Sequence, residues 1–159
     1  MIVEAVEPKS GKTMRMECAA SSENELRELL SFEISEDLLK KKINSMAISA
    51  DAKSVLFTIA KVSVRVGSTV VKIGRKILDV IARVLSDFPM ASTGVVFGAI
   101  FGFLVGSIPV LGLVLGPFVG ALAVAFGFAM GAVQDFGNKA LEQRIKASVA
   151  PFETLGPAT

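Results

Sequence analysis

The side chains that carry most enzyme chemistry are sparse in this sequence of 159 residues. It contains no histidine and a single cysteine, Cys18. An imidazole base, a histidine-paired nucleophile, a histidine-ligated zinc site and an intrachain disulfide are therefore excluded. Cys18 lies between Glu17 and two alanines, which favours a small buried side chain over a reactive thiol. We predict that the protein is not an enzyme and that it has no cofactor and no metal site.

One short motif resembles a phosphate-binding loop. The tripeptide Gly-Lys-Thr at 11–13 follows an apolar run that predicts a strand. The P-loop motif requires a glycine where Val6 stands, and it requires a helix after the loop. Residues 13–18 instead alternate in polarity as a strand does. We therefore interpret 8–12 as a polar turn between two strands.

The most distinctive charged pattern is a basic stripe between 51 and 87. Residues 61–66 alternate as a strand would, but the charged positions across the whole segment follow a period of about 3.6 residues. This spacing predicts one long basic amphipathic helix over 51–87. Solvent or anionic lipid head groups would satisfy its charges without a bound ligand. Five cations on it are candidate ligands for an anion: Lys61, Arg65, Lys72, Arg75 and Lys76.

Residues 1–50 have the pattern of a small water-soluble α+β domain. Two alternating apolar runs, 2–6 and 14–18, predict a β-hairpin. Serines that precede acidic residues predict helices near 23–31 and 36–48. A segment this short makes a thin core, so we expect neighbouring subunits to stabilise this cytosolic domain.

A long run without any charged residue extends from 88 to 134. As one helix it would measure about 70 Å, more than twice the bilayer's hydrocarbon core of about 30 Å. Pro109 interrupts it near the middle, which predicts a transmembrane hairpin with spans at 88–107 and 112–134. Basic residues flank the run on both sides, so both termini are expected in the cytoplasm. After it, 135–159 predicts a cytosolic amphipathic helix and a polar tail.

Glycines recur at every fourth position along the first predicted span, and the second predicted span has a similar glycine pattern. Glycine costs about 1 kcal/mol in a helix relative to alanine, so this many glycines need a packing reason, which is close approach of helix backbones. They would pack either the hairpin against itself or one subunit against the next. The candidate packing residues are Gly94, Gly98, Gly102, Gly106, Gly112, Gly116, Gly120, Gly127 and Gly131.

With these glycines the chain resembles glycine-zipper membrane hairpin proteins. Its layout of a small cytosolic domain, a basic helix and two glycine-striped spans also looks like the small oligomeric membrane effectors of bacterial antiphage defence. That resemblance implies a protein of the bacterial inner membrane that senses a cytosolic signal, often a nucleotide, and then breaches the bilayer as an oligomer. It implies a ligand but does not identify one.

We therefore predict a mainly α membrane protein, multi-pass, that acts as a homo-oligomeric channel or pore-forming effector. Its partners would be the lipid bilayer, further copies of the chain and an anionic ligand, either a nucleotide or a short nucleic acid. The alternative is a ligand-independent membrane scaffold, bilayer-remodelling protein or holin-like lysis protein. A colicin-like soluble form that buries the hairpin is disfavoured, because 51–87 and 135–148 offer it too little amphipathic cover.

Overall fold

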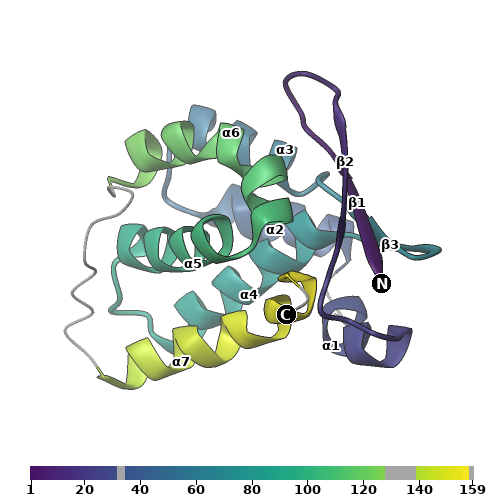
Figure 1. The fold of residues 1–159 in the computed structure, drawn as a ribbon. Helices are drawn as coiled ribbons and strands as arrows, with labels where there is room; N and C mark the ends of the chain where they lie inside the picture. Colours follow the sequence, from purple (N-terminus) through teal and green to yellow (C-terminus); the bar gives the residue numbers. More distant parts are fainter. Residues whose placement is uncertain (32–34, 128–138, 158–159) are drawn as a thin grey trace.

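The computed structural model describes residues 1–31, 35–127 and 139–157, and it places a four-stranded sheet beside a group of helices (Figure 1). The described strands are β1 (Ile2–Val6), β2 (Thr13–Glu17), β3 (Val64–Val66) and β4 (Thr69–Val71). The described α-helices are α1 (Arg27–Leu30), α2 (Glu36–Ser45), α3 (Ala50–Ile59), α4 (Ile73–Asp87), α5 (Thr93–Ser107), α6 (Pro109–Phe126) and α7 (Lys139–Val149). Two short 3-10 helices are η1 (Glu23–Leu26) and η2 (Ala150–Leu155). The chain is mainly helical with a small antiparallel sheet.

The sheet is antiparallel, in the order β2-β1-β3-β4. β1 pairs with β2 as the alternating apolar pattern predicted, with Val3 opposite Met16, so the predicted hairpin is confirmed. β3 and β4 are joined by a tight turn in which Gly67 has a φ of 62°, a conformation that a side chain rarely adopts. Alternate residues of these strands point to opposite faces, which leaves one face of the sheet buried and the other exposed.

The prediction of one long helix over 51–87 is wrong. The segment contains α3, then the hairpin of β3 and β4, and then α4. The strand-like alternation reflects the real structure here, because Val64 and Val66 are buried while Arg65 is exposed. The helical spacing of the later charges belongs to α4 alone. β1 offers β3 a strand edge to pair with, and this tertiary pairing overrides the local helical pattern.

The helix α5 lies at the centre of the helical layer, with α6 on one side and α4 and α7 on the other (Figure 1). Phe97 of α5 stacks on Phe126 at the end of α6, with ring centroids 4.2 Å apart. α6 in turn packs against α3 and β1. Burial of side chains of this size contributes about 1.5–3 kcal/mol each, so the uncharged run forms much of the core. The fully buried side chains of α5 are Val96, Phe97, Ile100, Phe101 and Leu104.

The predicted helical hairpin is present, but its helices are shorter than the predicted spans. α5 has 15 residues, where the prediction was 88–107. Among the described residues, α6 is the one helix that is long and apolar enough to cross a membrane, and 28% of it is buried. The end of the second predicted span, up to 134, lies outside the described residues. Passage of the hairpin through a bilayer stays a prediction.

The hairpin has more cover than the sequence indicated. α4 and α7 pack against α5, while α3 and β1 pack against α6. The expectation of too little cover is therefore wrong for α5, which α4 and α7 of those same segments cover, and it left out the cover that β1 gives to α6. It holds for the outer side of α6, where several small and apolar residues are exposed: Gly120, Ala121, Val124 and Ala125.

The C-terminal segment is not the polar tail that we predicted. η2 carries two fully buried side chains, Phe152 and Leu155. The backbone N–H of Ala20 donates to the carbonyl oxygen of Thr154 at 3.1 Å, and the carbonyl of Ala20 accepts from the terminal ammonium group of Met1 at 2.6 Å. The small N-terminal domain is therefore completed by later segments of the same chain, where we expected neighbouring subunits.

Candidate functional site

A cavity of about 520 Å³ opens where the N-terminal end of α4 meets α2, β4 and the end of α3. Much of its wall is apolar, formed by Leu39, Ile43, Phe57, Ala60, Val62 and Val70. Its charged lining residues are Glu36, Lys40, Lys61, Lys72 and Arg75. We call this cavity the basic pocket. A mostly apolar cavity with a few convergent polar groups is the usual form of a small-molecule site.

Local sequence signals place the helices that form this pocket. Ser35 caps α2 and Ser49 caps α3, each hydroxyl accepting a backbone N–H at 3.1 Å. Leu39 and Ile43 lie one helical turn apart, so both belong to the buried side of α2. The same two side chains line the pocket, which makes the inner side of α2 one of its walls.

Gly74 brings α4 against the end of α3 beside the pocket. Its backbone N–H donates to the carbonyl oxygen of Val62 at 3.0 Å. A Cβ atom at this position would overlap the carbonyl oxygen of Ile59 and lie 2.8 Å from its carbonyl carbon. The contact between these two helices therefore requires glycine at 74.

Positive charge exceeds negative charge around the basic pocket. Among the described residues that line it, four are cations and one is a carboxylate: Lys40, Lys61, Lys72, Arg75 and Glu36. Glu36 lies 3.4 Å from the ammonium group of Lys40 and 4.0 Å from the guanidinium group of Arg75. One carboxylate can balance at most one of the four cations among the described lining residues, so these contacts leave a net positive charge. The pocket therefore has a field that attracts anions.

Three of the five predicted anion ligands, Lys61, Lys72 and Arg75, line this pocket. Arg65 does not, because β3 holds it on the exposed face of the sheet, opposite Glu4 of β1. On that face Glu4 also lies opposite Arg15 of β2, so basic and acidic side chains alternate across the three strands. The predicted stripe is therefore not one continuous surface in the folded chain.

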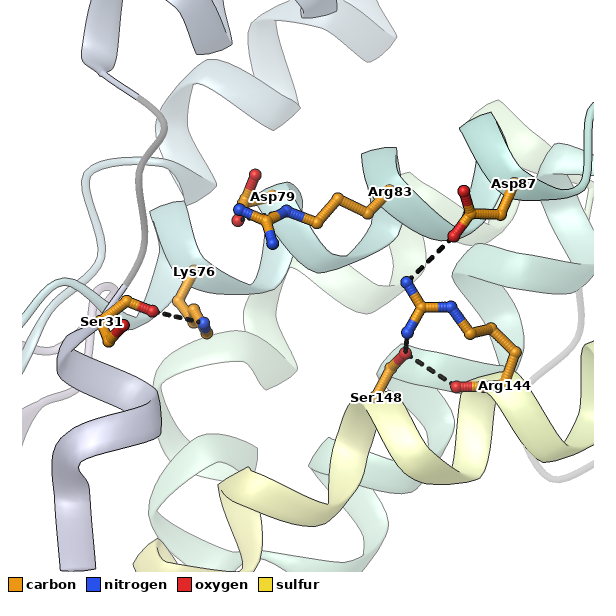
Figure 2. A network of polar contacts seen from close by, with 7 residues as sticks. All are labelled: Ser31, Lys76, Asp79, Arg83, Asp87, Arg144 and Ser148. Carbon is orange, nitrogen blue, oxygen red and sulfur yellow. Dashed lines mark hydrogen bonds and ion pairs between the residues drawn. The ribbon is translucent and has the colours of Figure 1, made fainter.

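The fifth predicted ligand, Lys76, also lies away from the basic pocket, on the side of α4 that faces α1 (Figure 2). Sequence reasoning also missed Lys40 and the apolar wall. A single helix over 51–87 gave no reason to bring α2 beside the basic stripe. The one sequence signal that could have identified this wall is the spacing of Leu39 and Ile43, which places both on the same side of α2.

A second group of polar residues joins α4 to its neighbours (Figure 2). Lys76 donates to the backbone carbonyl of Ser31, which follows α1, at 2.9 Å. Arg144 of α7 donates to a carboxylate oxygen of Asp87 at 3.1 Å and to the hydroxyl of Ser148 at 3.4 Å. Because each of these cations already has a protein partner, we interpret the group as a structural connection between α4, α1 and α7.

Burial of the Lys76 ammonium group lowers its pKa from the usual value of 10.5, and nearby Arg83 lowers it further, against the opposing charges of Asp79 and Glu28. The folded state therefore binds this proton less tightly than the unfolded state does. The free energy of unfolding should rise as pH increases toward 10.5, and Lys76→Met should remove that part of the rise. Urea unfolding of both proteins across the alkaline range measures it, and identical pH profiles would contradict it.

Two of the predicted packing glycines lie at close contacts within the hairpin. A Cβ atom at Gly94 would overlap the carbonyl oxygen of Phe126, and one at Gly112 would lie 3.0 Å from the carbonyl oxygen of Val105. Gly98 is buried in α5. These positions support packing of the hairpin against itself at its two ends.

The other described glycines of the stripes do not pack within the chain. A Cβ atom at any of four positions on α5 and α6 would meet nothing within 4 Å: Gly102, Gly106, Gly116 and Gly120. Gly127 ends α6 with a φ of 71°, as a helix C-cap does. Gly131 lies outside the described residues. Self-packing of the hairpin therefore leaves part of each glycine stripe open.

The other candidate sites are less developed. The Gly-Lys-Thr motif at 11–13 lies where the turn between β1 and β2 ends and β2 begins, so the helix that a P-loop requires is replaced by a strand. Within the described ranges, no group of three or more acidic or cysteine side chains is placed to hold a metal ion. No protein family, curated protein or solved structure matches this chain. Only the geometry of the described residues therefore bears on its function.

Proposed function

We propose that this protein is a homo-oligomeric channel or pore-forming membrane protein whose α5–α6 hairpin enters the bilayer. The observation that carries the proposal is the uncovered side of α6. This helix is long and apolar enough to span a membrane, it contains no charged residue, and only 28% of it is buried. Apolar surface of this extent is unfavourable in water and favourable in lipid.

The compact arrangement would be the form in which the hairpin is kept out of the bilayer. α4 precedes the hairpin and α7 follows it, and the two helices meet through the Arg144–Asp87 ion pair. An exposed ion pair contributes at most about 1 kcal/mol, so the free-energy cost of opening lies mainly in the packing of α4 and α7 against α5. Extension of α5 by the uncharged residues 88–92 would give it the length of about 30 Å that a span requires.

An anion would be the signal that controls this change. Lys61, Lys72 and Arg75 come together at the basic pocket, which lies between α3, a neighbour of α6, and α4, a neighbour of α5. A ligand there would contact elements on both sides of the helical layer. Binding to one arrangement only would shift the equilibrium between compact and inserted forms.

Gly102→Leu and Gly106→Leu should keep the compact fold and lose assembly in the membrane. A Cβ atom at either position meets nothing within 4 Å, so the compact form should accept a leucine side chain, whereas leucine would separate the backbones of neighbouring subunits. We expect smaller particles in detergent by light scattering, with a free energy of unfolding at least equal to the parent's. If both variants keep the parent's particle size, this part of the stripe is no subunit interface.

Release of a trapped dye from lipid vesicles tests the proposed function. The protein should bind the vesicles and release dye with a steep dependence on protein concentration, because several subunits form one pore. Cysteine labelling at Ser107 in a Cys18→Ala background should report the far side of the bilayer. Binding without dye release would favour the scaffold function, and absence of binding would contradict both.

A further inference from the structure

We propose that the basic pocket binds an anionic amphiphile, a molecule with a phosphate or carboxylate head and a saturated hydrocarbon body. The inference names the ligand class of the site above, and it rests on the proposed function for its regulatory consequence. It also differs from the nucleotide expected from the sequence.

The wall of the pocket favours hydrocarbon over a nucleobase. Its uncharged lining consists of the six apolar side chains described above, and Ser63 is the one uncharged polar side chain among the described lining residues. A nucleobase carries ring nitrogens and exocyclic groups that lose binding free energy when they are buried without hydrogen-bond partners. An alkyl chain has no such requirement, and it gains from the removal of its surface from water.

The charges of the pocket suit a single anionic head near the surface. The side chains of Lys61 and Lys72 are exposed, whereas that of Arg75 is only 18% exposed and is held beside Glu36. An arginine fixed in this way can bind a carboxylate or a phosphate through two parallel hydrogen bonds. The N-terminal end of α4, between Lys72 and Arg75, adds the positive end of a helix dipole. The head would lie at this mouth with the chain inside.

The elements that line the pocket give binding a consequence. A ligand in it would contact α2, α3, β4 and α4 at once. Because a ligand that binds only the folded arrangement stabilises it, an occupied pocket would hold α3 and α4 in place around the hairpin. Occupancy would therefore favour the closed, compact form, and loss of the ligand would permit insertion.

Isothermal titration of the full chain without vesicles tests the site. The probes are dodecyl phosphate and dodecanoate, kept below the concentrations at which they form micelles, with dodecanol as the uncharged probe and AMP as the nucleotide. The test variant is Lys61→Glu with Lys72→Glu, and the matched control is Lys12→Glu with Lys41→Glu, which changes the same charge on exposed residues that do not line the pocket. Val70→Trp, at a lining residue that is 55% exposed, would fill the pocket and leave its cations in place.

We expect dodecyl phosphate or dodecanoate to bind in a ratio of one per chain, and their relative affinities identify the head. The test variant and Val70→Trp should each weaken binding by about tenfold or more, and the control should not. Tighter binding of AMP, equal binding of dodecanol, or equal losses in the test variant and the control would each overturn the proposal.

A vesicle experiment then tests the regulatory consequence. Dodecyl phosphate should slow dye release by the parent and leave release by Val70→Trp unchanged. Faster release by the parent would overturn the closing role. If the amphiphile binds as expected but the protein never releases dye, the proposed pore function fails while the pocket assignment stands. If the protein releases dye but does not bind the amphiphile, the pocket assignment fails while the proposed pore function stands.

Discussion

Gly74→Ala should destabilise the protein by about 3 kcal/mol or more, enough to unfold a marginally stable domain. The added Cβ atom would overlap the carbonyl oxygen of Ile59 and lie 3.2 Å from that of Val62. Both are backbone atoms, so no side chain can rotate away and α3 must separate from α4. Urea unfolding followed by circular dichroism measures the loss.

Gly102→Ala is the matched control for this substitution. It also replaces a helical glycine, but a Cβ atom there meets nothing within 4 Å. The control should gain up to about 1 kcal/mol from the better helix propensity of alanine. Equal midpoints for the two variants would show that the close contact between α3 and α4 does not exist in solution.

Gly120→Asp should abolish vesicle insertion and leave the compact fold intact. Gly120 is exposed on α6, and a Cβ atom there meets nothing within 4 Å, so the compact form accepts the substitution. In the bilayer an aspartate near the middle of a span costs about 2.5–3.5 kcal/mol, which reduces insertion of each subunit by about a hundredfold. Co-flotation with vesicles measures binding, and dye release measures pore formation.

Gly120→Ala serves as the control for the charge. It removes the same glycine without adding a polar group, so insertion and dye release should equal those of the parent. Normal dye release by the aspartate variant would exclude α6 from the bilayer. A loss of folded structure in the same variant would show that the outer side of α6 is covered in solution.

The predictable parts of this fold are those in which a local sequence pattern determines the structure and no contact with a distant part of the chain competes with it. The alternation of residues 2–6 identified β1 because its side chains divide cleanly between the two faces of the sheet. The uncharged run identified the α5–α6 hairpin, since hydrophobic length is a property of the segment itself. The serine caps likewise located the start of α2 correctly at Ser35.

The unpredictable parts depend on partners that are distant in the sequence. β3 has three residues and pairs with β1, with Val66 opposite Val3, and the short alternation that marks it was outweighed by the helical spacing of the charges across the whole segment. Gly74 lies inside the single long helix that we predicted, whereas it marks a close contact between two helices. For the same reason three of the five predicted anion ligands line the basic pocket and two do not. The sequence showed the types of side chain, but it did not show the turn at Gly67, which reverses the direction of the chain between them.

The pairing of residues 18–20 with the C-terminal segment has a consequence for the order of events during synthesis. The N–H of Ala19 donates to the carbonyl of Gly156 at 2.8 Å, across almost the entire chain. A ribosome that adds about 5–20 residues per second would need about one to six seconds to pass from the end of α6 to η2. During that interval the uncharged hairpin exists without α7 or η2. In a nascent chain beside a membrane, the hairpin could therefore contact lipid before α7 and η2 pack against the rest of the fold. In a completed chain, the compact fold would have to open before the hairpin could contact lipid.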